Sequence, residues 1–303
     1  MKSDKIIIGS RGSKLALIYA NKVKKEIIKN LSVKVEIKSI TTEGDTNQKD
    51  RLSELGGKGM FSKKIEIELL ENKIDLAVHA LKDMPSIETD GLITNCFLKR
   101  NYPNEILISK NNIKFDELKS KSIIGTSSFR REYQLQMKRN DLIYKLIRGN
   151  VDTRIKKLND GLYDAIILAK AGIDSLNLNQ HITQEFSVEE IIPSVGQGVI
   201  AIQCRKNDNE LHKLLKKLNH EATSICVTAE RELLKTLEGD CNTPVGAISI
   251  LNKNYITLFA ELFSVNGKKR YFVKDKKSLN LAKELGKEIG EVLKKKSKGS
   301  YKK

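Results

Sequence analysis

The chain has 303 residues, of which 39% are hydrophobic and 31% charged, a composition typical of a globular protein that folds in water. This length predicts more than one domain, and the absence of any apolar run of about 18 residues excludes a membrane-spanning helix. The net charge of +17 would suit a nucleic-acid-binding protein, but residues 268–303 hold 14 basic and 4 acidic residues, a net charge of +10. Most of the excess charge therefore indicates a solvated, lysine-rich C-terminal region.

Residues 1–17 lack the apolar core and the cleavage site of a secretory signal, so we expect the chain to be cytoplasmic. The four cysteines, Cys96, Cys204, Cys226 and Cys241, form no C-x-x-C pair, and the four histidines are equally dispersed. This spacing predicts reduced thiols, with neither a metal site nor a disulfide framework.

The first 81 residues predict alternating strands and helices. Residues 6–8 predict a buried strand, Ser13 is placed to cap the helix that follows, and residues 33–40 alternate as a half-buried strand does. A glycine-rich polar segment leads to a helix on which Phe61, Ile65 and Leu69 would share a face. Residues 74–81 predict another buried strand.

Two stretches of this first part recur later in the chain. "IIIGSRGS" at 6–13 is matched by "SIIGTSSF" at 122–129, and "KIDLAVHALKD" at 73–83 is matched by "LYDAIILAKAG" at 162–172. If the repeat is real, two similar α/β lobes face each other across a cleft, with ligand-binding groups at the carboxyl ends of their strands. Chance similarity between α/β units is the alternative.

The pattern changes in the last third of the chain. Residues 195–205 predict one more strand after a glycine-rich turn, and the next long helix is expected to end at Gly239. Residues 247–251 and 255–263 alternate as antiparallel strands do, and a lysine-rich helix follows them. We expect this part to form a small third domain of α+β type.

Arginines gather in one part of this lysine-rich chain. Five of the eleven lie between residues 130 and 154: Arg130, Arg131, Arg139, Arg148 and Arg154. They accompany "GTSSFRR" and "LIRGNVDTR", two turns that each open a predicted helix, where anions are favoured. Because a guanidinium group binds a carboxylate or phosphate through two parallel hydrogen bonds, the cluster predicts an anionic ligand. Surface ion pairs at two solvated helix starts are the alternative.

Asp83 is a second candidate, because in "AVHALKDMP" it directly follows an apolar strand, with Lys82 before it. A carboxylate at the C-terminal end of a buried strand can accept hydrogen bonds, oppose a developing positive charge or move protons. A simple turn-forming role is the alternative. We interpret His79, inside the strand, as a hydrogen-bonded strand residue and not as a catalyst.

The segment "GGKGMFSKK" lacks the spacing of a phosphate-binding loop. Its glycines favour a hinged lid between the lobes, formed by Gly57, Lys58, Gly59 and Phe61. A plain connecting loop is the alternative.

Cys241 lies on a turn in "LEGDCNTPVGAI", where a thiol is accessible to chemistry. No histidine is near it in the sequence, so a cysteine-protease arrangement has little support. The position favours a covalent attachment point over a nucleophile that turns over.

From about residue 5 to 265 the sequence resembles the porphobilinogen deaminase (hydroxymethylbilane synthase) family. The resemblance is carried, in order, by "SRGSKLAL", "GGKGMFSKKIE", "DLAVHALKDMP", "IIGTSSFRRE", "IRGNVDTRIKKL", "YDAIILAKAG", "PSVGQGVIAIQCR" and "NHEATSICVTAERELLKTLEGDCNTPVG". It implies a transferase of tetrapyrrole biosynthesis that joins four porphobilinogen molecules head to tail, with release of ammonia, to give hydroxymethylbilane. It also implies a dipyrromethane cofactor, held by a thioether to Cys241, that primes the chain.

The resemblance further implies roles for the candidate residues. Asp83 would be the catalytic carboxylate, which stabilises the cation left when porphobilinogen loses ammonia. The cofactor would be held by Lys82, Asp83, Thr126, Ser127, Ser128, Arg130, Arg131 and Arg148, and the substrate by Arg11, Ser13, Arg148 and Arg154. Four residues depart from the family pattern: Tyr19, Glu54, Ala80 and Ser175. Of these, Glu54 and Ser175 weaken the positive lining of the site.

The implied fold is α/β, with two periplasmic-binding-protein-like lobes plus a small α+β third domain, in a monomer. Residues 1–99 and 194–218 would form the first lobe, residues 100–193 the second, and residues 219–303 the domain that carries the Cys241 loop. A non-catalytic anion-binding protein of the same two-lobed fold is one alternative, against which the cysteine loop and the third domain speak. A nucleic-acid-binding protein is the other, against which the 5% aromatic content and the location of the charge speak.

Overall fold

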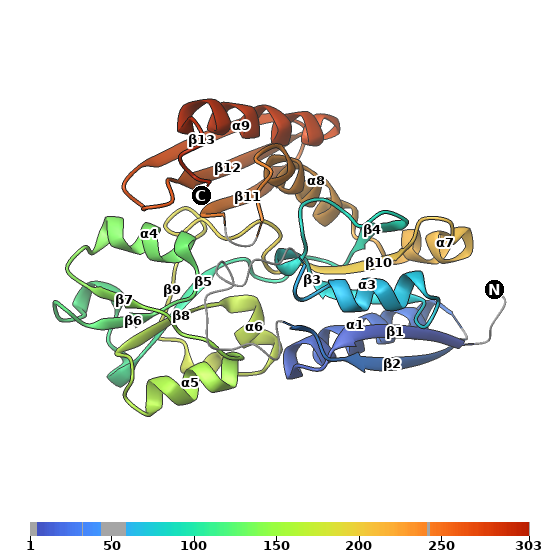
Figure 1. Ribbon diagram of the computed structural model, residues 1–303, viewed down its shortest axis with the longest axis horizontal. Coiled ribbons are helices and arrows are strands. Elements are labelled where there is room, and N and C mark those ends of the chain that lie inside the picture. The colour runs from blue at the N-terminus through green and yellow to red at the C-terminus, as the bar shows by residue number, and fades with distance from the viewer. Residues whose placement is uncertain (1–4, 32, 44–58, 241–242, 303) are drawn as a thin grey trace.

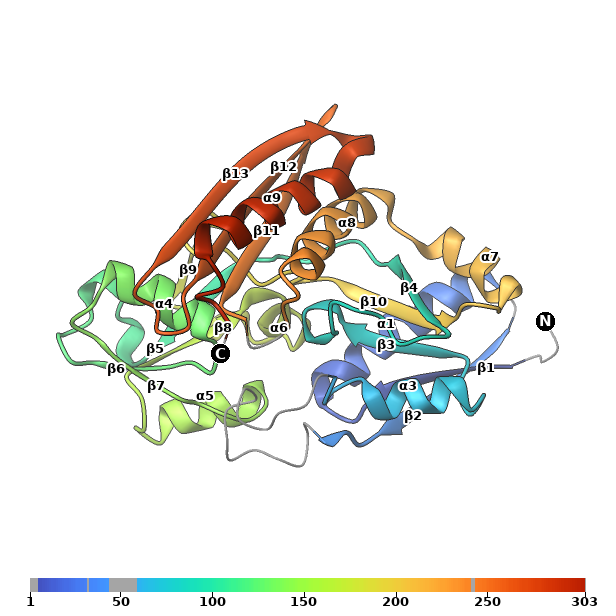
Figure 2. The same ribbon diagram turned by 45° about the horizontal axis from the view of Figure 1, so that its top comes forward.

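The computed structural model describes residues 5–31, 33–43, 59–240 and 243–302, and it arranges them around three β-sheets (Figure 1). Two five-stranded sheets with their helices lie beside each other as lobe 1, which contains β1, and lobe 2, which contains β6. A three-stranded sheet with two long helices forms the third domain, which packs against both lobes (Figure 2). None of the described helices combines the length and the apolar character needed to cross a membrane.

Lobe 1 has the strand order β2-β1-β3-β10-β4. Its strands are β1 (Lys5–Arg11), β2 (Lys34–Ile40), β3 (Leu76–Ala80), β4 (Leu92–Phe97) and β10 (Ile200–Arg205). The strands β2, β1 and β3 are parallel, whereas β10 is antiparallel to β3 and β4. Helices α1 (Lys14–Asn30) and α7 (Asn209–Leu218) bury apolar side chains on one face, and α3 (Lys63–Leu70) does so on the other.

Lobe 2 has the strand order β7-β6-β8-β5-β9. Its strands are β5 (Glu105–Ser109), β6 (Ile123–Gly125), β7 (Ile143–Lys145), β8 (Ala165–Ala169) and β9 (Gln184–Glu185). Helix α4 (Phe129–Lys138) packs on one face, and α5 (Val151–Asn159) and α6 (Lys170–Ser175) pack on the other. Short 3-10 helices at Leu81–Asp83, Lys110–Asn112, Phe115–Glu117, Asn179–His181 and Leu279–Leu281 connect elements of the molecule.

The repeat seen in the sequence is a structural one, because the two strand orders match position by position, with β1 equivalent to β6 and β3 equivalent to β8. In each lobe an aspartate before the later strand accepts a hydrogen bond from the backbone of the earlier one. Asp75 Oδ2 accepts from the N–H of Ile7 at 2.8 Å, and Asp164 Oδ2 accepts from the N–H of Ile123 at 2.7 Å. The predicted pair of α/β lobes is therefore confirmed.

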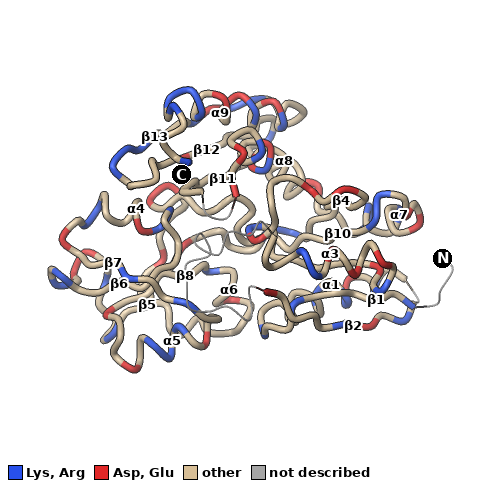
Figure 3. The backbone as a smooth tube through the Cα atoms, in the orientation of Figure 1, with Lys and Arg blue, Asp and Glu red and all other residues tan. Residues whose placement is uncertain are grey.

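The third domain consists of β11 (Val245–Asn252), β12 (Tyr255–Phe263) and β13 (Arg270–Ser278), with α8 (Glu221–Thr236) and α9 (Ala282–Ser297) on one face of the sheet. The strands are antiparallel, as the sequence predicts for β11 and β12. The expected helix end at Gly239 is wrong, because α8 ends at Thr236 and Glu238, with φ of 53°, takes the left-handed conformation. Figure 3 shows the dense lysines and arginines of β13 and α9.

One carboxylate of the third domain contacts both crossings between the lobes. The chain passes from lobe 1 to lobe 2 through residues 98–104 and returns through residues 186–199. Glu230, fully buried on α8, accepts hydrogen bonds from Arg100 Nη1 at 2.8 Å and Nη2 at 2.6 Å, in the first crossing. It also accepts one from the N–H of Gly196, in the second crossing, at 2.9 Å. The third domain is thus anchored on the hinge between the lobes.

Candidate active site

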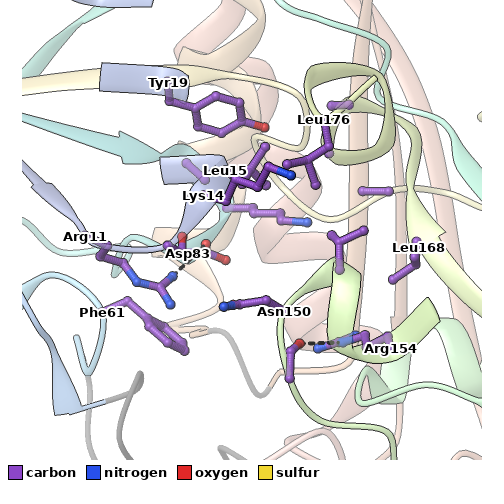
Figure 4. A pocket seen from close by; sticks show the side chains of 18 of the residues that line it. Arg11, Lys14, Leu15, Tyr19, Phe61, Asp83, Asn150, Arg154, Leu168 and Leu176 are labelled. Atoms are coloured by element: carbon purple, nitrogen blue, oxygen red, sulfur yellow. Dashed lines mark hydrogen bonds and ion pairs between the residues drawn. The ribbon is translucent and has the colours of Figure 1, made fainter. Parts of the chain in front are cut away.

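A cavity of about 530 Å³ opens between the two lobes (Figure 4). Lobe 1 contributes the β1–α1 turn and the 3-10 helix after β3, and lobe 2 contributes α5, α6 and the loop before α5. Its charged lining consists of six cationic side chains against two acidic ones: Arg11, Lys14, Lys82, Arg131, Arg148 and Arg154, with Asp83 and Asp152. Such an excess of positive charge fits a ligand with several anionic groups.

Asp83 lies at the C-terminal end of β3 and lines the cavity, at the position that the sequence predicts. Its side chain is 36% exposed, and its Oδ2 is 4.0 Å from Nη1 of Arg11 (Figure 4). The Arg11 guanidinium group also lies over the ring of Phe61, 4.1 Å from the ring centroid. Arg11 is thus held beside the carboxylate from the lobe 1 side of the cavity.

Burial lowers the pKa of the cationic side chains Lys82, Arg148 and Arg154. For Arg154 the like charges of Arg131 and Arg148 add to the desolvation, and its pKa falls to about 10. The group remains charged at neutral pH. An anionic ligand would relieve the unfavourable proximity of these like charges, because an opposite charge nearby favours the ionised form.

Arg130 and Arg131 share one carboxylate but do not share the cavity. Glu105, buried at the start of β5, has Oε1 2.7 Å from Arg130 Nη2 and Oε2 2.7 Å from Arg131 Nη2. Arg130 also donates to the carbonyl of Ile192 at 2.9 Å, and only Arg131 lines the cavity. The predicted contact of Arg130 with a cofactor stays a prediction. Burial alone would raise the pKa of Glu105, but Arg131 and Arg130 outweigh it and lower this pKa to about 2.

We expect Glu105→Gln to lower the free energy of unfolding at pH 7 by about 3–5 kcal/mol, because it leaves two buried guanidinium groups without their carboxylate. The folded-state pKa of about 2 lies below the ordinary value of 4.5. The carboxylate therefore stabilises the fold above pH 4.5, and this contribution is lost as the pH falls from 4.5 towards 2. Urea unfolding at pH 7 and at pH 3 measures both effects.

The control variant is Glu210→Gln, which removes an exposed carboxylate 2.9 Å from Lys213 and should leave the free energy of unfolding unchanged. If Glu105→Gln is as stable as the parent protein at pH 7, or if its deficit is the same at both pH values, the ion-paired role of Glu105 is wrong.

The hydroxyl residues before α4 shape its first turn and are not among the residues that line the cavity. Ser128 Oγ accepts from the N–H of Arg131 at 3.4 Å, Thr126 Oγ1 accepts from the N–H of Ser128 at 3.2 Å, and Ser127 Oγ donates to the carbonyl of Ile147. In lobe 1, Ser13 lines the cavity and caps α1 as predicted, accepting from the N–H of Ala16 at 3.3 Å.

The predicted lid is only partly within the described residues, because Gly57, Lys58 and the departure Glu54 lie outside them. Gly59, with φ of 77°, takes a left-handed conformation that suits glycine. Phe61 lines the cavity, but the expectation that it shares a helix face with Ile65 and Leu69 is wrong, because α3 begins only at Lys63.

Cys241 also lies outside the described residues, but the residues before it are anchored close to the segment that follows Asp83. The carbonyl of Gly239 accepts a hydrogen bond from Ser86 Oγ at 2.7 Å, and Ser86 follows Asp83 by three residues. Asp240 and Thr243, on either side of the cysteine loop, bond to each other through the N–H of Asp240 and Thr243 Oγ1 at 3.0 Å. The loop therefore begins beside the segment that follows Asp83.

Sequence reasoning missed the role of Glu105 and the lining residues Lys14 and Asp152, although these two lie within the quoted segments "SRGSKLAL" and "IRGNVDTRIKKL". His79 is buried as expected, and burial lowers its pKa to about 4, so the ring is neutral at pH 7. Its Nε2 has no hydrogen-bond partner among the described residues, so the expected full hydrogen bonding is not met. Cys96, Cys204 and Cys226 are buried free thiols. Among the described residues, no group of three His, Cys, Asp or Glu is placed to hold a metal ion.

Two α/β lobes around a cationic cavity, with one carboxylate at a strand end, define a two-lobed protein whose cavity suits polyanionic ligands. The family model described as "porphobilinogen deaminase, dipyromethane cofactor binding domain" matches residues 6–213, and "porphobilinogen deaminase, C-terminal domain" matches residues 224–295. The chain belongs to the porphobilinogen deaminase family.

Among curated relatives, the porphobilinogen deaminase of Staphylococcus carnosus is 41% identical over 96% of this chain and 94% of its own length. That of Bacillus subtilis is 46% identical over 82% of this chain and 79% of its own length. Solved structures give weaker matches. A putative methionine-binding lipoprotein of Bacillus subtilis is 13% identical, with a TM-score of 0.46 over 73% of this chain and 92% of that one. The periplasmic VFT2 domain of Bordetella pertussis BvgS is 13% identical, with a TM-score of 0.45 over 72% and 87%. The family assignment does not depend on these structures.

Proposed function

We propose that this chain is a hydroxymethylbilane synthase of tetrapyrrole biosynthesis, a transferase that joins four porphobilinogen molecules head to tail and releases ammonia. Family membership supplies the activity and the substrate class. The cationic cavity between the lobes is a suitable binding site for such a polycarboxylate substrate. The observation that carries the proposal is the carboxylate of Asp83 facing a cavity whose other charged side chains are all cationic except Asp152.

The residues of the cavity fit a dipyrromethane, the group for which the matching family model is named. Each of its pyrrole units carries an acetate and a propionate, so the group brings four carboxylates. The six cationic side chains suit this charge, and Arg131 Nε is buried without a hydrogen-bond partner among the described residues. Lys82, Arg131 and Arg148 would hold the carboxylates, and Cys241 would hold the covalent link. When bound, the group supplies the free pyrrole carbon from which the chain is extended.

Asp83 is assigned the catalytic role. Loss of ammonia from porphobilinogen leaves a positive charge shared with the pyrrole ring. A carboxylate that accepts the pyrrole N–H stabilises this charge as it develops, and it can receive the proton released from the reacting carbon. Arg11, at 4.0 Å, orients the carboxylate. Together with Ser13, Arg148 and Arg154, it would bind the acetate and propionate groups of the substrate.

We extend the proposal to the organisation of the chain. Residues 1–99 with 194–218 form lobe 1, residues 100–193 form lobe 2, and residues 219–303 form the third domain. The strand membership of the three sheets supports this division. We also propose a cytoplasmic monomer that binds neither nucleic acid nor membrane, which a single gel-filtration peak at the mass of one chain would support.

We expect Arg148→Gln to raise the KM for porphobilinogen by about 10- to 100-fold, because it removes charge-assisted hydrogen bonds to carboxylates. Arg139→Gln is the matched control, since Arg139 belongs to the same arginine cluster but binds Asp141 at 2.7 Å and does not line the cavity. Steady-state kinetics of both variants measure the difference. Equal KM values in the two variants would contradict the assignment of Arg148.

A further inference from the structure

A second cavity, of about 1070 Å³, lies at the hinge and is larger than the catalytic one. Its walls come from α1, α7 and β10 of lobe 1, from the first crossing between the lobes, and from α6 of lobe 2. We call it the hinge groove. Tyr19 and Gly198 line both cavities, so they form a common wall. Figure 4 shows Tyr19 at the edge of the catalytic cavity, with its hydroxyl directed towards Leu176 of lobe 2.

Four exposed lysines from three separate segments converge on the hinge groove: Lys22 and Lys25 from α1, Lys99 from the first crossing, and Lys217 from α7. None of them makes an ion pair with a carboxylate in the part of the chain that the structure describes. The acidic lining residues are Glu26 and Asp174, and Asp174 already accepts hydrogen bonds from Asn101 at 3.1 Å and from Asn179 at 3.2 Å. The groove therefore carries a cationic rim.

The floor of the hinge groove is apolar and contains one unusual polar group. Leu98, Ile200 and Leu218 line it, together with Tyr102, which is 53% exposed. Ser175 is only 9% exposed, and although its Oγ comes near the Tyr19 hydroxyl, it makes no hydrogen bond of normal geometry with any described residue. An apolar concave floor, a cationic rim and a buried hydroxyl suit a flat apolar body that carries several carboxylates.

The ordinary interpretation of four exposed lysines is a solvated surface, which is common in a chain of this composition. Here the lysines line a concave groove together with apolar side chains of lobe 1 and with Asp174 and Ser175 of lobe 2, and a solvated helix face has neither feature. The location also matters for turnover. The catalytic cavity of about 530 Å³ is of a size that encloses one drug-sized ligand. The hinge groove is lined by both crossings between the lobes, residues 98–103 and Gly198, so a ligand bound there contacts the segments on which the separation of the lobes depends.

We propose that the hinge groove is a second binding site, separate from the catalytic cavity, for planar polycarboxylates of the kind that tetrapyrrole synthesis yields. The choice of ligand rests on the proposed function, whereas the anion site itself does not. A ligand that touches both lobes favours the interlobe arrangement to which it binds best. Its binding therefore slows chain growth without competing with porphobilinogen, and it limits the output of the enzyme when such products accumulate.

The probe is uroporphyrin I, a planar macrocycle with eight carboxylates. Equilibrium dialysis against the holoenzyme measures binding, and steady-state kinetics measure inhibition. The groove variant is Lys22→Glu with Lys217→Glu. The matched control is Lys29→Glu with Lys216→Glu, which makes the same charge change at exposed positions of the same two helices, outside the groove. Thermal melting checks that both variants are folded.

We expect uroporphyrin I to bind the parent enzyme and to lower kcat with the KM for porphobilinogen unchanged. The groove variant should bind the probe roughly tenfold more weakly or worse, because two attractive charges become repulsive, and the control variant should bind like the parent. Absence of binding, or competitive inhibition that is equal in all three proteins, would overturn the proposal. Turnover without the probe is measured in the same assay, so a failure of the proposed function shows as absent turnover, while dialysis still tests the groove.

Discussion

We expect Asp83→Asn to lower the turnover of porphobilinogen by about 100- to 1000-fold or more, while the fold and the covalently bound group remain. The amide has the shape of the carboxylate and still accepts a hydrogen bond. It cannot balance the positive charge that develops when ammonia leaves, and it cannot take up the released proton. Steady-state kinetics measure the loss, and the intact mass of the purified variant shows whether the covalent group is still attached.

Asp152→Asn is the matched control, because Asp152 is the other acidic side chain that lines the cavity and lies in the first turn of α5. We expect this variant to keep turnover close to that of the parent enzyme. Parent-like turnover of Asp83→Asn would remove Asp83 from the catalytic role. An equal loss in both variants would show that the total negative charge of the cavity matters, and not the position of Asp83.

We expect Cys241→Ser to abolish the mass increment of two linked pyrrole units and, with it, nearly all turnover. The proposed link is a thioether, and the serine hydroxyl is a much weaker nucleophile than a thiolate at neutral pH. Mass spectrometry of the intact protein measures the increment directly. Cys226→Ser is the control, since Cys226 is a buried thiol on α8, and this variant should keep the full increment.

The same measurement separates the proposed enzyme from a non-catalytic anion-binding protein of similar fold. A parent protein that carries no added mass, and that stays unmodified when supplied with porphobilinogen, would argue for the binding protein. An increment that persists in Cys241→Ser would place the attachment on another residue.

The sequence predicts most helices and strands because their apolar residues are periodic. The prediction fails where contacts between distant parts of the chain determine the local structure. Strand β13 was missed because lysines alternate along its exposed side, and only its pairing with β12 makes it a strand. The sequence predicts that α8 ends at Gly239, yet the helix ends at Thr236 and Glu238 takes the left-handed conformation. Its carboxylate binds Lys294 at 2.7 Å and Lys302 at 2.6 Å, contacts with the C-terminal part of the chain that no local pattern contains.

The candidate site likewise has features that the sequence predicts and features that only the structure reveals. Asp83 could be found because the end of a buried strand is a general place for ligand-binding groups. The arginine cluster could be found by its density, but the sequence does not show which of its members line the cavity. Arg130 and Arg131 are neighbours on α4, and the choice of Arg131 for the cavity depends on Glu105, which lies 25 residues before Arg130 and between the two guanidinium groups. The sequence around α4 therefore gives no indication that Glu105 lies between these two side chains.

The buried Glu230 connects the third domain to both crossings between the lobes. Its carboxylate accepts hydrogen bonds from Arg100 in the first crossing between the lobes and from the N–H of Gly196 in the second. Helix α8, which carries Glu230, leads directly towards the Cys241 loop. The segment that leads to Cys241 is therefore tied to both crossings through Glu230 and, through the carbonyl of Gly239 and Ser86 Oγ, to the residues after Asp83, so one short stretch of chain links the hinge to the cysteine loop.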